Sequence, residues 1–248
     1  MNWNPWHGCE KVSAGCANCF VFMLDRRYGR DTTVFSVNQA LDLPIRRGRN
    51  GEYKLWASPY VFTCSNSDFF LPAADHVRGK AWEYIKERSD LNFLIPTKRV
   101  ERIAGALPAD WNMKDYGHVY LSCSCENQEM ADARLPVYLG LELPHYTVQL
   151  EPLIGAVDLS KYLERNLIEK VTVEGEFGKG VRPCHEAWVR ELYLQCRRYD
   201  TNMAFRRAGD ILIDLDNAIY PKQPRGSQDY AGQLGYNYES TSRETVMW

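Results

Sequence analysis

Short apolar segments alternate with helical segments along most of the chain, and this alternation limits the fold more than any other feature. Each apolar segment has the length of a strand, and apolar residues at helical spacing follow it. Strands joined through helices pair in parallel, with right-handed crossovers, so we predict an α/β protein. The predicted strands are YVFTCS (60–65), LNFLIP (91–96), HVYLSCS (118–124), YTVQL (146–150), KVTVEGE (170–176) and NMAF (202–205). The predicted helices cover 20–28, 73–88, 100–107, 129–140, 158–164 and 185–199.

Polar side chains follow nearly every predicted strand, and their positions help to choose an architecture. An open doubly wound sheet and a complete or partial (β/α) barrel both fit the alternation. In a barrel the polar strand ends converge on one mouth, whereas an open sheet gathers fewer of them. We therefore predict a partial (β/α) TIM-like barrel of about six parallel strands, with a short or distorted first strand near Trp3. This single domain is expected to span residues 1–220, and the polar segment 221–248 is either a flexible tail or a cover for the opening.

Three cysteines lie close together in the segment WNPWHGCEKVSAGCANC, directly before a predicted helix. Cys9, Cys16 and Cys19 are separated by six and then two residues, and a pair two residues apart can direct both thiolates at one metal centre. Gly8 and Gly15 allow backbone N–H groups to turn inward, towards sulfur or a bound anion. Three thiolates are one ligand short of a structural zinc site, whereas a four-iron cluster on three cysteines leaves one iron open.

Three other interpretations of the cysteines stay open. They could be unrelated thiols, or they could form a zinc site completed by His7 or by a distant cysteine. A disulfide framework is the least favoured, because the chain is far longer than the small secreted domains that need such bridges. The distant cysteines are Cys64, Cys123, Cys125 and Cys184.

Composition is that of a globular metalloprotein in a reducing compartment. The chain has 248 residues, of which 45% are hydrophobic and 25% charged, so disordered and fibrous classes are excluded. We expect a cytoplasmic protein without a membrane segment, because neither a secretory signal nor a stretch of about 18 apolar residues is present. The eight cysteines are then reduced thiols and metal ligands. A net charge of −2 argues against bulk attraction to nucleic acid but allows local basic patches.

Six motifs in a fixed order carry a family resemblance: WNPWHGCEKVSAGCANC, CSNSDFF, LIPTKRVERI, SCSCENQEMADARLP, LEPLIGAVDLS and VEGEFGKGVRPCHEAWVRELYLQC. They closely resemble a family of phage and prophage proteins with a three-cysteine motif, over residues 2–209. That family is similar in turn to the radical SAM superfamily, including spore photoproduct lyase, although mainstream members space their cysteines three and two residues apart. The resemblance implies a [4Fe-4S] cluster on Cys9, Cys16 and Cys19, with S-adenosylmethionine bound to the open iron. It also implies a reductant protein of the flavodoxin or ferredoxin type.

The chemistry that the resemblance implies suggests roles for the polar strand ends. The ammonium group of the cofactor requires carboxylate or carbonyl oxygens, and its carboxylate requires a cation. For any one of these residues, a helix cap or an ion pair is the alternative role. The candidates are Ser65, Asn66, Ser67 and Asp68 for the ammonium, Lys98 and Arg99 for the carboxylate, and Glu126, Glu151 and Glu176 for the ribose hydroxyls.

Basic residues near the last predicted strand suggest a substrate class. Arg206 and Arg207, with Lys98 and Arg99, are predicted to make the mouth positive and to bind an anionic substrate such as a nucleotide or a nucleic-acid strand. The leading function is a radical SAM-type enzyme that makes a 5′-deoxyadenosyl radical and abstracts hydrogen from its substrate. The alternative is a non-enzymatic phage protein in which a zinc or cluster site stabilises a nucleic-acid-binding or partner-binding surface.

Overall fold

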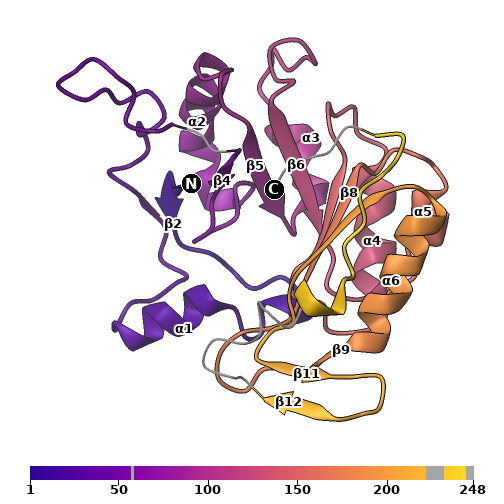
Figure 1. The fold of residues 1–248 in the computed structure, drawn as a ribbon. Helices are drawn as coiled ribbons and strands as arrows, with labels where there is room; N and C mark the ends of the chain where they lie inside the picture. The colour runs from indigo at the N-terminus through magenta and orange to yellow at the C-terminus, as the bar shows by residue number, and fades with distance from the viewer. Residues whose placement is uncertain (57–58, 222–231, 244–248) are drawn as a thin grey trace.

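The computed structural model describes residues 1–56, 59–221 and 232–243, and its centre is a seven-stranded sheet (Figure 1). The strand order is β1-β4-β5-β6-β7-β8-β10, and every neighbouring pair is parallel. The sheet curls into a half-barrel, so the carboxyl ends of the strands face one mouth. The strands are β1 (Asn2–Trp3), β4 (Val61–Thr63), β5 (Phe93–Thr97), β6 (Val119–Ser124), β7 (Thr147–Leu150), β8 (Lys170–Glu174) and β10 (Asn202–Arg207).

The predicted strands all form, in the predicted order and with parallel pairing. The expected short first strand near Trp3 is β1, which pairs with β4 through Asn2 opposite Phe62 and Trp3 opposite Thr63. The prediction of an α/β protein with a curled parallel sheet is therefore confirmed, with seven strands in place of about six.

Most helices lie on the outer face of the sheet. They are α2 (Asp75–Glu87), α3 (Ile103–Ala106), α4 (Gln128–Tyr138), α5 (Ser160–Leu163) and α6 (Glu186–Arg198). Helix α1 (Phe20–Arg27) follows the cysteines and stands apart from this layer, beside the mouth of the half-barrel (Figure 1). Within the described ranges, no helix has both the length and the apolar character needed to cross a membrane.

The two faces of the sheet differ in chemistry. The outer face carries apolar residues that pack under the helices, among them Leu121, Val148, Val171 and Phe205. The inner face carries buried polar residues at the alternate positions. These are Ser122 and Ser124 on β6, Thr147 and Gln149 on β7, Lys170 and Thr172 on β8, and Asn202 on β10. Parallel strands buried on both sides are usually apolar on both, so a polar inner face is a special property of this half-barrel.

Two small sheets lie outside the half-barrel and were not predicted. One pairs β2 (Trp6–His7) with β3 (Ser36–Val37), within an excursion that is otherwise irregular, as the sequence predicted for residues 30–55. The other joins β9 (Cys184–His185), β11 (Ile211–Ile213) and β12 (Ile219–Pro221). The predicted helix at His185 therefore begins one residue later, at Glu186.

The predicted C-terminal tail is partly described, since residues 222–231 and 244–248 lie outside the described ranges. Residues 232–243 lie along β10, where Met203 and Tyr238 exchange two backbone hydrogen bonds of 2.8 and 2.9 Å. Asp200 accepts a hydrogen bond from the Tyr238 hydroxyl at 2.7 Å. This part of the tail is therefore attached to the last strand of the sheet.

A close backbone approach at the mouth gives the first prediction. Gly175 follows β8 directly, and a Cβ at this position would collide with the carbonyl oxygen of Ala208 after β10. We expect Gly175→Ala to lower the free energy of unfolding by about 1–3 kcal/mol, because the two chain segments must separate. Gly79→Ala, in the middle of α2 with open space around it, should raise the same quantity by about 1 kcal/mol. Urea unfolding measures both, and an unchanged Gly175→Ala variant would contradict the close approach.

Candidate active site

A cavity of about 440 Å³ lies between the cysteine loop and the carboxyl ends of the strands. This volume is in the usual range for sites that bind small molecules. Most residues predicted to form a site line it, whereas Asn66 and Glu126 do not. The predicted residues in its wall are Cys9, Cys16, Cys19, Ser65, Ser67, Asp68, Lys98, Arg99, Glu151, Glu176, Arg206 and Arg207.

The cysteine loop has a backbone path that glycine makes possible. Gly8 has a φ of 108°, and a Cβ there would lie 2.8 Å from the Cα of Phe35. Cys9 is fixed by its N–H, which donates to the carbonyl oxygen of Thr32 at 2.8 Å. Cys16 ends the short 3₁₀ helix η1 (Ala14–Cys16), and Cys19 is the N-cap of α1. All three thiols therefore reach the cavity from one loop.

The three cysteines line one cavity, but their side chains do not form a preformed metal site. Among the residues that the structure describes, no three His, Cys, Asp or Glu side chains are grouped so that they could hold a metal ion. Burial raises the pKa of the Cys9 thiol to about 11, and the nearby charge of Arg99 only partly opposes this. A metal centre on these thiols would therefore have to displace a proton from Cys9.

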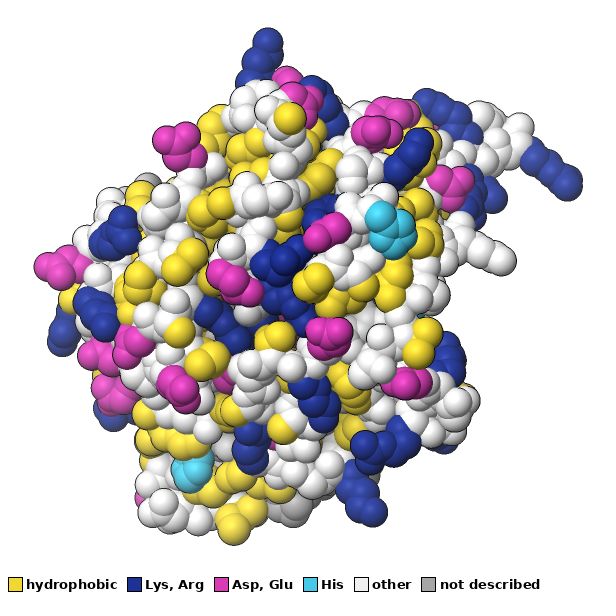
Figure 2. All heavy atoms as spheres, turned by 180° about the vertical axis from the view of Figure 1, so that it is seen from behind, with side chains coloured by type: hydrophobic (Ala, Val, Ile, Leu, Met, Phe, Trp, Pro, Cys, Tyr) yellow, Lys and Arg dark blue, Asp and Glu magenta, His cyan; other side chains and the backbone are white. Residues whose placement is uncertain are grey.

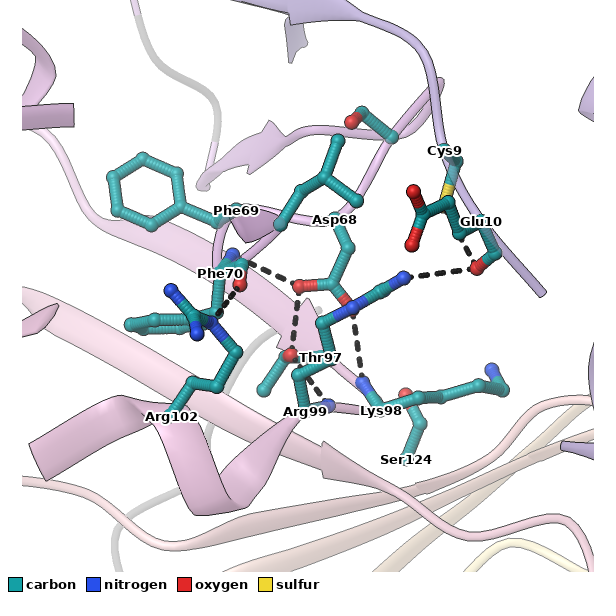
Figure 3. A network of polar contacts seen from close by, with 12 residues as sticks. Cys9, Glu10, Asp68, Phe69, Phe70, Thr97, Lys98, Arg99, Arg102 and Ser124 are labelled. Atoms are coloured by element: carbon teal, nitrogen blue, oxygen red, sulfur yellow. Dashed lines mark hydrogen bonds and ion pairs between the residues drawn. The ribbon is translucent and has the colours of Figure 1, made fainter. Parts of the chain in front are cut away.

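Asp68 and Arg99 form the centre of a polar network beside Cys9 (Figure 3). The guanidinium of Arg99 lies 3.1 Å from the Asp68 carboxylate and donates to the carbonyl oxygen of Glu10 at 2.9 Å. The same carboxylate accepts hydrogen bonds from the Thr97 hydroxyl at 2.8 Å and from the N–H of Lys98 at 3.1 Å. Asp68 is therefore occupied in holding Arg99 against the cysteine loop, a different role from the predicted contact with a cofactor ammonium group.

The predicted ammonium-binding residues after β4 also fasten the loop. The Ser65 hydroxyl and the N–H of Asn66 both donate to the side-chain oxygen of Asn4, at 3.1 and 3.0 Å. The Ser67 hydroxyl donates to the carbonyl oxygen of Gly8. These contacts join the end of β4 to the chain on both sides of β2.

Glu126 lies behind the cysteine loop, in contrast to its predicted place beside a ribose. One carboxylate oxygen accepts the N–H of Gly15 at 3.0 Å, and the other accepts a 2.8 Å hydrogen bond from Arg134 on α4. Burial acts to raise the pKa of Glu126, but the Ser13 hydroxyl, the charge of Arg134 and the Gly15 N–H outweigh it, so the pKa is lowered. The anion bound by the backbone N–H of Gly15 is therefore the carboxylate of Glu126, a side chain of the protein itself.

Glu176 holds the other side of the loop. Its carboxylate accepts hydrogen bonds from the N–H of Arg182 at 2.8 Å and from the side-chain amide of Asn18 at 3.0 Å. Arg182 also donates to the carbonyl oxygen of Ala14 at 2.9 Å. Glu126 and Glu176 thus clamp the cysteine loop from β6 and β8.

The predicted positive mouth is not supported, because its arginines are paired with carboxylates. Glu174 lies 3.0 Å from Arg207 and 3.3 Å from Arg206, and Arg206 lies 3.7 Å from Glu151. The cavity wall contains four basic side chains and four carboxylates, so its formal charges cancel. The face shown in Figure 2 likewise has basic and acidic side chains interspersed.

The other proposed zinc ligands are divided between the cavity and the core. His7 is engaged by the buried carboxylate of Asp25 at 2.7 Å, and Cys123 lies 3.5 Å from Cys125 within the core. Cys64 alone among the distant cysteines that we considered lines the cavity.

Several contributors to the site had no distinctive sequence signal. They are Asn4, Asn18, Arg134, Gln149, Glu174 and Arg182. Glu174 and Gln149 stand at alternate positions of predicted strands, which could have placed them on the inner face. Arg182 and Asn18 meet only through the tertiary fold.

Comparison with known protein families matches a family model described as a protein of unknown function (DUF5131) over residues 1–234. The chain belongs to the DUF5131 family. Searches of curated proteins and of solved structures find no match. For this DUF5131 chain, the geometry of the cavity is therefore the basis for any statement about function.

The second prediction concerns the buried ion pair of Glu126 and Arg134, which lies behind the cysteine loop. Glu126→Gln should lower the free energy of unfolding by about 3 kcal/mol, because it leaves the buried charge of Arg134 without its counter-ion. It should also speed the labelling of Cys16 by a thiol reagent. Glu129→Gln, on the exposed side of the first turn of α4, should change stability by less than about 0.5 kcal/mol. Equal effects of the two substitutions in urea unfolding would contradict the clamp.

Glu151 gives a prediction of pH dependence. Burial and the charge of Glu174 raise its pKa from 4.5 to about 7, against the opposing charge of Arg206. The folded protein therefore favours the protonated acid, and this contribution to stability is present below pH 4.5 and is lost as the pH rises through 7. Glu151→Gln should remove the loss, so its stability relative to the unmodified protein should grow between pH 5 and pH 8, by up to about 3 kcal/mol.

Urea unfolding at both pH values measures this difference. Glu142→Gln is the control, because this side chain is exposed and lies outside the cavity wall. A relative stability of Glu151→Gln that is the same at pH 5 and pH 8 would show that Glu151 titrates normally.

Proposed function

We propose that this chain is an iron–sulfur enzyme of the radical SAM type, with a [4Fe-4S] cluster on Cys9, Cys16 and Cys19 and S-adenosylmethionine as cofactor. The observation that carries the proposal is the position of the three cysteines on one loop, in the wall of a cavity at the carboxyl ends of a parallel half-barrel. Catalytic groups of (β/α) barrels gather at this end of the strands. The resemblance of the sequence motifs supports the same assignment.

The donor set in the cavity fits such a group. Three thiols can hold three irons of a four-iron cluster and leave the fourth open, and the apolar residues Phe20, Phe62 and Phe177 in the wall limit the access of water. When bound, the cluster would supply one electron to the sulfonium of S-adenosylmethionine and yield a 5′-deoxyadenosyl radical. Lys98 is suited to the carboxylate of the cofactor, because within the described part of the chain its ammonium group donates only to the carbonyl oxygen of Glu151, at 3.3 Å.

The chain's own residues hold the loop and its charge. Glu126 and Glu176 fix the backbone around Cys16, and Arg99 places a positive charge beside Cys9. A cation beside a thiolate favours the ionised form that binds metal. Residues of the wall thus hold the cysteine loop at the cavity before any metal arrives.

A reductant protein is part of this proposal. Helix α1 begins directly after Cys19 and exposes Phe20, Leu24 and Tyr28, with exposed fractions of 47%, 44% and 62%. Arg26 and Arg27 are exposed on the same helix. An acidic electron-transfer protein of the flavodoxin or ferredoxin type would match both the apolar surface and the charge.

One observation favours a second candidate, a zinc-stabilised protein without catalytic activity. Cys64 lies in the same cavity as the three loop cysteines, so a fourth thiol is available to close a tetrahedral site. In that case the cavity would be a binding surface for a partner or a nucleic acid.

Metal analysis separates the two candidates. After anaerobic purification and reduction with dithionite, we expect about four irons and four sulfides per chain and formation of 5′-deoxyadenosine from S-adenosylmethionine. Cys16→Ala should abolish both the iron content and the product. The control Cys196→Ala, in α6 on the outer side of the sheet, should retain them.

The substitution of Cys64 shows which candidate fails. If Cys64→Ser retains the iron and the product, the three loop cysteines are sufficient. One zinc per chain that is lost in Cys64→Ser, with no iron after anaerobic purification, would overturn the enzyme and establish the closed zinc site.

A further inference from the structure

The polar inner face of the half-barrel forms two cross-strand rows beneath the mouth. Ser124, Gln149 and Thr172 are neighbours in register on β6, β7 and β8. The row below it consists of Ser122, Thr147, Lys170 and Asn202, again in register. The cavity reaches the upper row, since Ser124 and Gln149 are part of its wall. Ser124 and Gln149 form its floor, and the second row lies beneath them.

Three side chains of these rows have unused hydrogen-bonding atoms. The amide nitrogen of Gln149 and the hydroxyls of Thr147 and Thr172 are buried, and none of them has a hydrogen-bond partner among the described residues. None of the three residues is more than 2% exposed, so bulk water does not compensate these groups. A buried donor without a partner destabilises a protein, and such groups are retained where a ligand uses them.

The charges around the floor limit the kind of ligand. Arg206 and Arg207 are paired with Glu174, and Arg99 is paired with Asp68. A phosphate or carboxylate at the floor would have to displace one of these carboxylates in order to pair with an arginine. The remaining basic side chain of the wall, Lys98, is assigned to the cofactor carboxylate in the proposed function. An uncharged ligand meets no such obstacle.

We propose that Gln149, with Ser124, binds an uncharged ring amide of the substrate at the floor of the cavity. A primary amide and a cyclic amide are complementary, because each offers one N–H donor and one carbonyl acceptor side by side. The hydroxyl groups nearby can donate or accept. The inference rests on the proposed function in treating this ligand as the substrate, and it replaces the anionic substrate that the sequence suggested.

The test combines stability and binding in the full chain, purified without added iron. The probe is glutarimide, an uncharged cyclic imide, titrated by ligand-observed NMR. Gln149→Leu should weaken its binding about tenfold, because the amide contacts are lost. The same variant should raise the midpoint of thermal unfolding by about 2–4 °C, because it removes a buried donor without a partner. Inorganic phosphate should not displace the probe.

The matched control is Gln195→Leu on α6. Its amide accepts the N–H of Leu159 at 2.7 Å, so this substitution should lower the midpoint and leave glutarimide binding unchanged. Thr147→Val, in the row beneath the floor, is a second variant that keeps the shape of the side chain, and it should also raise the midpoint. If Gln149→Leu does not fold, the midpoint of thermal unfolding of Thr147→Val decides the stability test.

Three results would overturn the inference. The first is a midpoint that falls in both Gln149→Leu and Thr147→Val, which would mean that these groups are satisfied by structural water. The others are binding of glutarimide that is absent or equal in Gln149→Leu, and displacement of the probe by phosphate. Because no iron is needed, these results are independent of the cluster assay, and a failure of either proposal can be recognised separately.

Discussion

The buried carboxylate of Glu126 connects the two parts of the molecule that enclose the cavity. It stands at the end of β6, and it binds the N–H of Gly15 in the cysteine loop on one side and Arg134 of α4 on the other. A buried carboxylate is tolerated only with such partners, so the loop and the helix are both needed to keep it there. The position of Cys16, one residue after Gly15, therefore depends on the sheet and on a helix far away in the sequence.

The second property of the site is that the arginines of the cavity wall are neutralised by carboxylates of the same wall. Its basic side chains do not form a positive surface, because each arginine of the wall lies against a carboxylate. The sequence shows the arginines and the acids separately, and only the fold shows that they meet. In the two proposals made above, the cavity separates two tasks: the thiols at its rim hold a metal and its cofactor, and its floor holds an uncharged group.

The sequence was sufficient to predict the fold, because apolar residues recur at the spacing of a strand or of a helix along each predicted element. Val119, Leu121 and Cys123 alternate with polar residues along β6, and this pattern gives both the strand and its two faces. The sequence also indicated the loop whose three cysteines line the cavity. It could not show that Glu126 binds a backbone N–H, because this contact depends on residues 111 positions apart. The two small sheets were missed since their strands have only two or three residues each.

The attachment of residues 232–243 to β10 has a consequence for solubility. An open half-barrel has two edge strands, and an edge strand with free backbone groups can pair with other molecules and cause aggregation. On one side the edge is β1, which has two residues and offers little to pair with. On the other side Tyr238 occupies the N–H and C=O of Met203. Removing this segment would leave the edge of β10 open to self-association, so residues 232–243 protect the sheet from intermolecular pairing.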